Sequence, residues 1–190
     1  RGLNTLFTRL SDHTNEGEII QSHKKKAIET GIKLAKGTLI VTTDADCLFP
    51  VDWLITIARF YEKNNATFIA APVRITATSS LLSVFQTLDF LTLQGITGAS
   101  VFKRIHSMCN GANLAYEKAA FMEVGGFKGI DDIPSGDDML LMHKIYRKYP
   151  ENVFYLKSSA AIVSTAAMSS WKQFFHQRIR WASKSGSYDD

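Results

Sequence analysis

Two aspartates one residue apart, Asp44 and Asp46, directly follow a run of apolar and β-branched residues at 38–43. The run is nearly continuous rather than alternating, which predicts a strand covered on both faces in a parallel sheet. Ligands of such sheets bind outside the carboxyl ends of the strands, where both carboxylates would lie. Mg²⁺ and Mn²⁺ prefer oxygen ligands and often take one or two carboxylates together with substrate phosphates and water. The pair therefore predicts a divalent-cation site, although a D-x-D motif alone also occurs by chance.

A second acidic pair, Asp137 and Asp138, follows Gly136 at the predicted start of a helix. Carboxylates at this position cap a helix and interact favourably with its dipole, and no catalysis is needed to explain them. Considered alone, the pair is therefore better explained by helix capping than by catalysis.

Two groups of side chains toward the ends of the chain could meet an anionic ligand. Lys24 is the first residue of a predicted helix, a position where the helix dipole disfavours a cation. Its side chain therefore either extends into solvent or contacts a phosphate bound at the helix N-terminus. Gln177, Arg180 and Trp181 share about one turn of a predicted helix near the C-terminus. They belong either to an amphipathic helix with a packed Trp, or to a site in which Arg binds a phosphate bidentately and Trp stacks on a ring.

The composition is that of one globular domain over residues 1–190. Apolar residues make up 45% of the chain and charged residues 21%, so disorder is not expected, and no apolar run is long enough for a transmembrane helix. The net charge of +4 favours anionic partners. Nucleic acid is not expected among them, because the basic residues are not interleaved with aromatic residues on one face. Two cysteines cannot build a disulfide framework.

The first half of the chain alternates between predicted strands and helices, which is typical of βαβ units and a parallel sheet. The predicted strands cover residues 3–10, 38–43, 67–73, 108–116, 152–156 and 160–163. The predicted helices cover residues 24–36, 50–64, 79–97, 118–124, 138–149 and 170–183. Gly95, Gly98 and Ser100 are expected to end the third helix in a loop.

Five segments carry the motifs of the chain: residues 24–31, 44–46, 110–127, 136–141 and 177–181. In this order and approximate spacing they resemble family 2 glycosyltransferases, the group that includes cellulose, chitin and hyaluronan synthases. The resemblance implies an α/β fold of the GT-A type, with a mostly parallel central sheet flanked by helices. It also implies inverting transfer of a sugar from a nucleotide-diphosphate sugar, often a uridine diphosphate sugar, to a hydroxyl of a saccharide or lipid-linked acceptor.

The resemblance further implies roles for individual residues. Asp44 and Asp46 would hold Mg²⁺ or Mn²⁺ on the donor diphosphate, and Lys24 would contact the donor. Asp138, next to Asp137, would be the catalytic base that takes the proton of the acceptor hydroxyl. The remaining contacts implied are those of Asp44, Gln177, Arg180 and Trp181 with the donor, and those of Gly111, Asn113 and Trp181 with the acceptor.

Two departures from the family pattern shape these expectations. The family's Thr-Glu-Asp is Gly136-Asp137-Asp138 here, which keeps two carboxylates and shortens the first. The family's N-terminal strand and acidic loop, which bind the base and ribose, have no counterpart, so we expect an N-terminally truncated, soluble piece whose metal site stays empty without donor. The parent protein is expected at the cytoplasmic face of a membrane, held by segments absent from this chain. The alternatives are an inactive nucleotide-sugar-binding or interaction domain and a sugar nucleotidyltransferase.

Overall fold

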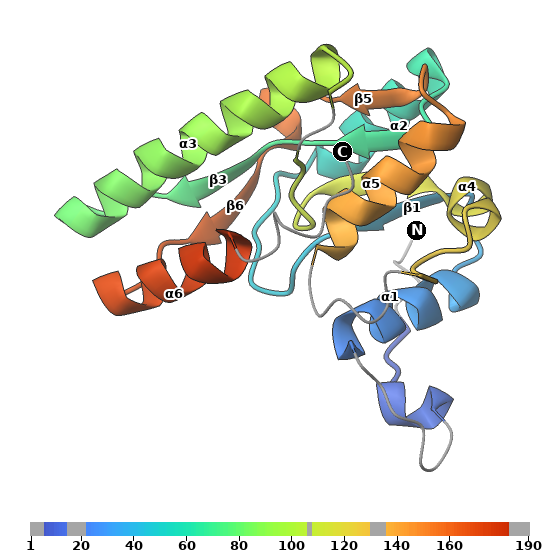
Figure 1. Ribbon diagram of the computed structural model, residues 1–190, viewed down its shortest axis with the longest axis horizontal. Coiled ribbons are helices and arrows are strands. Elements are labelled where there is room, and N and C mark those ends of the chain that lie inside the picture. The colour runs from blue at the N-terminus through green and yellow to red at the C-terminus, as the bar shows by residue number, and fades with distance from the viewer. Residues whose placement is uncertain (1–5, 15–21, 106–107, 130–135, 183–190) are drawn as a thin grey trace.

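The structure is a computed structural model that describes residues 6–14, 22–105, 108–129 and 136–182. It has the α/β class expected from the sequence, with a central sheet flanked by helices (Figure 1). Four strands form this sheet in the order β1 (Leu39–Thr42), β4 (Leu114–Glu117), β2 (Phe68–Ala70) and β5 (Val153–Tyr155). A second sheet pairs β3 (Val73–Thr76) with β6 (Val163–Ala166) in parallel.

The helices of the described ranges surround these two sheets. They are α1 (His23–Leu34), α2 (Trp53–Asn64), α3 (Leu81–Phe102), α4 (Lys118–Glu123), α5 (Asp137–Lys148) and α6 (Trp171–Ala182), with short 3₁₀ helices η1 (Leu10–His13) and η2 (Ser159–Ala161). Within these ranges, no helix combines the length and the apolar character that crossing a lipid bilayer requires.

The central sheet is parallel except for β4. Strands β2 and β5 pair in parallel, whereas β4 pairs antiparallel with both β1 and β2. Strands β1, β2 and β5 therefore run in one direction, and β4 lies reversed between β1 and β2. The carboxyl end of β1 and the segment that leads into β4 consequently meet at the same edge of the sheet.

Both faces of the central sheet are buried, as the continuous apolar character of its strands predicts. Alternate side chains of neighbouring strands point to opposite faces. Phe68, Leu114 and Tyr116 pack in a core cluster with residues of α1, α4 and α5. Ile69 and Ala115 pack in a second cluster with residues of α2, α3, β3 and β6. The sheet thus forms a rigid base between two layers.

The predicted strand over residues 3–10 is wrong for the part that the structure describes. Residues 6–9 form no strand, and Leu10 begins η1. Leu6 and Phe7 are 70% and 92% exposed, so no packing supports an extended segment here. The preference of a residue for strands depends on such packing, which the sequence pattern alone does not show.

Three other predicted strands differ from the observed ones in length or position. Pro72 lies between β2 and β3, which join different sheets, so the strand predicted over residues 67–73 is divided. The carbonyl oxygen of Pro72 accepts a hydrogen bond from the backbone N–H of Val163 at 3.1 Å. Strand β4 begins only at Leu114. The strand predicted over 160–163 is displaced, because η2 includes its first two residues and β6 covers Val163–Ala166.

Helix α3 does not end where the sequence predicts. It continues through Gly95, Gly98 and Ser100 to Phe102. A Cβ atom on Gly98 would lie 3.1 Å from Cε1 of Tyr155, so the glycine allows the helix to pack closely on β5. Glycine inside a helix costs only about 1 kcal/mol relative to alanine, which such packing can offset.

Two glycines end α4, as the sequence predicts, and both have positive φ angles: 75° for Gly125 and 52° for Gly126.

We expect Gly126→Ala to lower the free energy of unfolding by about 2–4 kcal/mol, because of left-handed backbone strain and overpacking. The added Cβ would lie 2.9 Å from Cε1 of Phe121. Gly125→Ala is the matched control, because open space surrounds its Cβ and only the strain of about 1–2 kcal/mol remains. Urea unfolding measures both variants, and equal losses would show that the Phe121 ring is not the obstacle.

Candidate active site

The D-x-D aspartates lie at the carboxyl end of β1, as predicted. The chain turns immediately after the strand, and the backbone N–H of Cys47 donates to the carbonyl oxygen of Asp44 at 3.2 Å. Leu48 then exchanges two backbone hydrogen bonds with Ser164, at 2.8 and 2.7 Å, which fix the turn against β6. Asp44 is half-buried and Asp46 is exposed. Both carboxylates are therefore held on a tight turn.

Lys24 belongs to the first turn of α1, whose N-cap is Ser22. Its Nζ lies 3.3 Å from Oδ1 of Asp44, and both side chains remain about half exposed. An ion pair this accessible contributes about 0–1 kcal/mol to stability, so it does little to hold the fold. The pair instead places a cation next to the D-x-D turn. The neighbouring Lys25 is buried.

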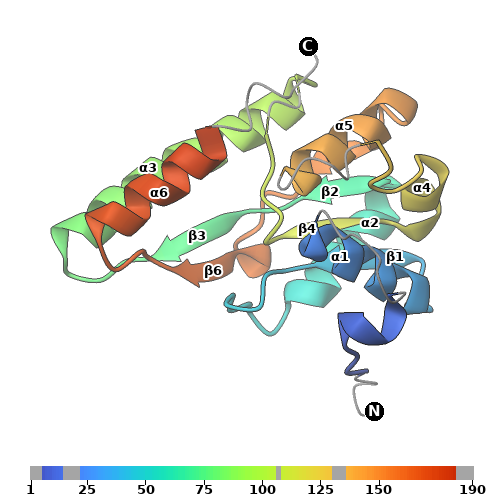
Figure 2. The same cartoon turned by 60° about the horizontal axis from the view of Figure 1, so that its bottom comes forward.

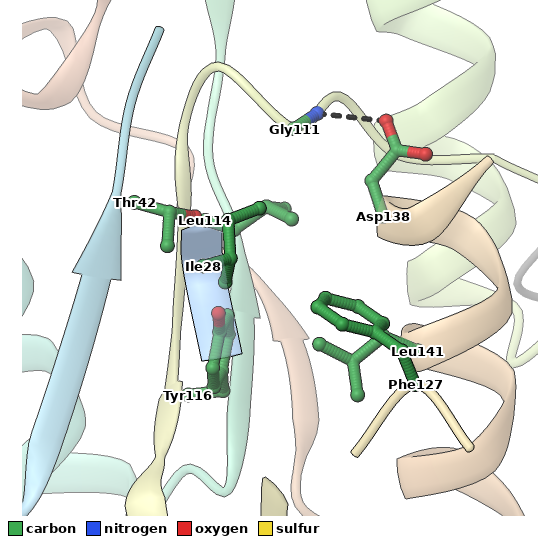
Figure 3. Close-up of a pocket in the computed structure, with 8 residues that line it drawn as sticks. All are labelled: Ile28, Thr42, Gly111, Leu114, Tyr116, Phe127, Asp138 and Leu141. Atoms are coloured by element: carbon green, nitrogen blue, oxygen red, sulfur yellow. Dashed lines mark hydrogen bonds between the residues drawn. The ribbon is translucent and has the colours of Figure 1, made fainter. Parts of the chain in front are cut away.

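Asp138 enters the same region from the start of α5, after Gly136 with a φ of 85°. Its Oδ2 accepts a hydrogen bond from the backbone N–H of Gly111 at 2.8 Å, and its Oδ1 accepts one from the N–H of Met139 at 2.9 Å. Figure 3 shows Asp138 pointing from α5 toward Gly111, beside a small pocket lined also by Thr42 and Leu114. The structure thus orients this carboxylate through contacts beyond its own helix.

Gly111 is the point where these side chains converge. A Cβ atom built on it would lie 3.4 Å from Oδ2 of Asp138 and 3.6 Å from Nζ of Lys24. Lys24 also pairs with Asp44, so the ammonium group beside Gly111 connects the Asp138 carboxylate region to the D-x-D turn. The absence of a side chain at Gly111 keeps the space between them open.

Asn113 holds the loop that carries Gly111. Its exposed fraction is 0%, and its Oδ1 accepts from Nε1 of Trp53 at 3.0 Å. Its Nδ2 donates to the carbonyl oxygens of Pro72 and Ala161, both at 2.7 Å. The side chain therefore joins α2, the end of β2 and η2 beneath the loop, and it reaches no open surface where an acceptor could contact it.

The remaining residues expected at the site form a second group. Gln177, Arg180 and Trp181 lie on α6, which runs beside α3 (Figure 2). This helix pair lies near β3 and β6, whereas the first group lies at the ends of β1 and β4 (Figure 1). Asp137 is the first residue of α5, and its side chain is outside the described part of the structure.

Asp44 and Asp46 have the chemistry of a hard-cation site, because both are accessible carboxylates on one turn. Among the described residues, no group of three or more His, Cys, Asp and Glu side chains could hold a metal ion. Mg²⁺ often takes only one or two carboxylates and completes its coordination with substrate phosphates and water, so the two aspartates fit a cation that arrives with a diphosphate.

The Cys47 thiol follows the second aspartate and is buried. Burial, followed by the negative charges of Asp46 and Asp44, raises the pKa of this thiol. A thiol with a raised pKa stays protonated at neutral pH as long as no metal binds it.

Sequence reasoning missed two side chains that hold the expected site residues in place. Trp53 binds Asn113, and Asp89 on α3 binds Arg178 on α6. The partners in each pair are far apart along the chain, and nothing local indicates the contact. In the sequence, Trp53 is one of the apolar residues on one face of the predicted helix over residues 50–64. Asp89 is the only charged residue of α3, and this is the one signal that the sequence offers.

A family model described as glycosyl transferase family group 2 matches residues 39–184 of the chain. The matched region runs from β1 to the end of α6 and includes Asp44, Gly111 and Asp138, whereas Lys24 precedes it. A search of curated proteins finds no match. The family match extends over well more than half of the chain.

Proposed function

Because the chain belongs to glycosyl transferase family group 2, we propose that it transfers a sugar, with inversion, from a uridine diphosphate sugar to a hydroxyl of a saccharide or lipid-linked acceptor. Membership makes the chain a glycosyltransferase domain that uses a nucleotide-sugar donor and an acceptor. The observation that carries the finer proposal is that Lys24 and Asp138 both lie beside Gly111, with Asp44 paired to Lys24. Such a site places the Asp138 carboxylate, which can act as a base, near the ammonium group of Lys24.

In this proposal Asp138 is the catalytic base. As the acceptor oxygen attacks the anomeric carbon, its proton passes to the Asp138 carboxylate. The bond between the anomeric carbon and the donor diphosphate breaks at the same time, and its electron pair leaves with the diphosphate. The hydrogen bond from Gly111 fixes the direction of the carboxylate, which favours a short proton transfer. Asp137 would add a second negative charge at the start of α5.

The leaving diphosphate needs positive partners. Lys24 at the first turn of α1 would contact it, and Arg180 with Gln177 would bind it from α6. Mg²⁺ or Mn²⁺ held by Asp44 and Asp46 would neutralise the charge that develops on the leaving group. Trp181 would stack on the acceptor sugar, and Gly111 would leave room for it. Asn113 acts indirectly, because it holds the Gly111 loop from below.

A donor panel tests the proposed function. The chain, and any longer protein that contains it placed in membranes, is incubated with nucleotide sugars and acceptors, with Mg²⁺, Mn²⁺ or a chelator. Membrane samples are included because the parent protein is expected at the cytoplasmic face of a membrane. Metal-dependent formation of a glycoside from one uridine diphosphate sugar supports the proposal. Absence of transfer from every donor contradicts it.

We expect Asp44→Asn and Asp46→Asn each to lower kcat/KM by about 100-fold or more, since stabilising a leaving diphosphate with a cation is worth several kcal/mol. Initial rates over a range of Mn²⁺ concentrations measure the effect, and the variants should also need more metal. Asp52→Asn is the matched control, because Asp52 is exposed at the start of α2 and makes no side-chain capping bond. Transfer that survives chelation would contradict the metal role of both aspartates.

A further inference from the structure

Arg178 on α6 makes an ion pair that joins this helix to α3. Its Nε donates to Oδ2 of Asp89 at 2.9 Å, and its Nη2 contacts the same oxygen. The side chain of Arg178 is 18% exposed and that of Asp89 is 32% exposed, so the pair is more shielded from solvent than the pair of Lys24 and Asp44. Shielding strengthens an ion pair and makes its geometry matter more.

The same guanidinium also contacts two of the site residues expected on α6. Its Nη1 donates to Oε1 of Gln177 at 3.0 Å. Its Cζ lies 4.2 Å from the centre of the Trp181 ring, within the range of a cation–π contact. The Trp181 ring also packs on Phe90, the neighbour of Asp89, with the ring centres 6.1 Å apart. Asp89, Arg178, Gln177 and Trp181 therefore form one connected unit.

Other contacts already attach α6 to α3. The ring of Phe85 lies 5.5 Å from that of Trp171 and 5.6 Å from that of Phe174, at the first half of α6. These aromatic contacts supply the apolar attraction that holds the two helices together. The ion pair is thus not required to attach α6, and its specific effect falls on the second half, where Gln177 and Trp181 lie.

We infer that Asp89 and Arg178 are positioning residues that set the orientation of Gln177 and Trp181. The inference rests on the proposed function in so far as these two side chains contact donor and acceptor. Arginine suits the task, because its planar group binds the carboxylate, the Gln177 amide and the indole face at once. A lysine could pair with Asp89 but could not make this set of contacts.

The test combines kinetics with a probe of Trp181. The chain has three tryptophans, so 5-fluorotryptophan labelling gives three fluorine NMR signals, which single Trp→Phe variants assign. The variants are Asp89→Asn, Arg178→Met, Arg178→Lys and the double variant Asp89→Asn/Arg178→Met. Lys172→Met is the matched control, because it removes an exposed cation from the same helix.

We expect Asp89→Asn and Arg178→Met each to shift the Trp181 signal, to leave the Trp53 signal in place and to raise the KM for donor or acceptor about tenfold. The double variant should raise the KM no more than either Asp89→Asn or Arg178→Met alone, since the two residues act as a unit. The KM of Arg178→Lys should lie between the values for wild type and Arg178→Met. Lys172→Met should resemble wild type in every measurement.

An unmoved Trp181 signal, with an activity loss that follows the folded fraction at unchanged KM, would overturn the inference and leave Arg178 a purely structural residue. Thermal unfolding of each variant gives the folded fraction needed for this comparison. If wild type transfers no sugar, the proposed function fails, and the shift of the Trp181 signal alone then supports or overturns the positioning.

Discussion

Asp138→Asn should reduce kcat for sugar transfer by about 10²–10⁴-fold, the usual contribution of a general base. The amide has nearly the same shape as the carboxylate, and its oxygen can still accept the hydrogen bond from Gly111. It cannot accept the proton of an acceptor hydroxyl. Initial rates with the donor identified by the panel measure the loss, and thermal unfolding of the same samples should show little change.

Glu62→Gln is the control for Asp138→Asn. Glu62 is an exposed carboxylate on α2, so its neutralisation changes the net charge by the same amount without touching the site. We expect its kcat to equal that of wild type. If Asp138→Asn retains full activity while both variants are folded, Asp138 is not the base and the proposed mechanism is wrong.

Asn113→Ala should have the largest effect on stability, lowering the free energy of unfolding by about 3 kcal/mol or more. It leaves the N–H of Trp53 and the carbonyl oxygen of Ala161 buried without their partner, each at about 1–3 kcal/mol, and it adds a cavity. The carbonyl of Pro72 is less affected, because it also accepts from the backbone of Val163. Guanidinium unfolding measures the loss.

Two further variants separate the hydrogen bonds of Asn113 from its volume. Asn113→Asp keeps the volume and the acceptor for Trp53, but it turns a carboxylate oxygen toward two carbonyl oxygens, so it should destabilise at least as much as Asn113→Ala. Asn64→Ala is the control, because Asn64 makes one partly exposed hydrogen bond to Phe60 within α2 and should lose less than 1 kcal/mol. A stable Asn113→Asp variant would show that the network is not needed.

The parts of the fold that depend on local patterns could be predicted from the sequence. The strand before Asp44 and the helix that begins near Lys24 occur where expected, because strand composition and helical periodicity are properties of short segments. The turn that carries Asp44 and Asp46 also follows from its place at the end of a strand. Only the boundaries shift by a few residues.

Features that depend on distant partners could not be predicted. The reversed strand β4 lies between β1 and β2 because of pairing between segments far apart in the chain, and its own sequence does not specify its neighbours. The family resemblance implies that Asn113 contacts an acceptor, and in the sequence a polar residue in a small turn has the same appearance whether it faces a ligand or a buried network. Only the burial of the Asn113 side chain distinguishes a residue in a buried network from one that faces a ligand.

The position of β4 also determines when the site can form. Strands β1 and β2 are not paired with each other, so the central sheet stays open until the later segment enters between them. Pairing over such sequence distances is slow, because a long loop must close before any contact compensates for it. The segment that closes the sheet is preceded directly by the loop that carries Gly111. During synthesis, Asp44 and Asp46 would therefore emerge well before Gly111, whose backbone N–H binds the Asp138 carboxylate, and we expect this contact to form only once β4 has joined the sheet.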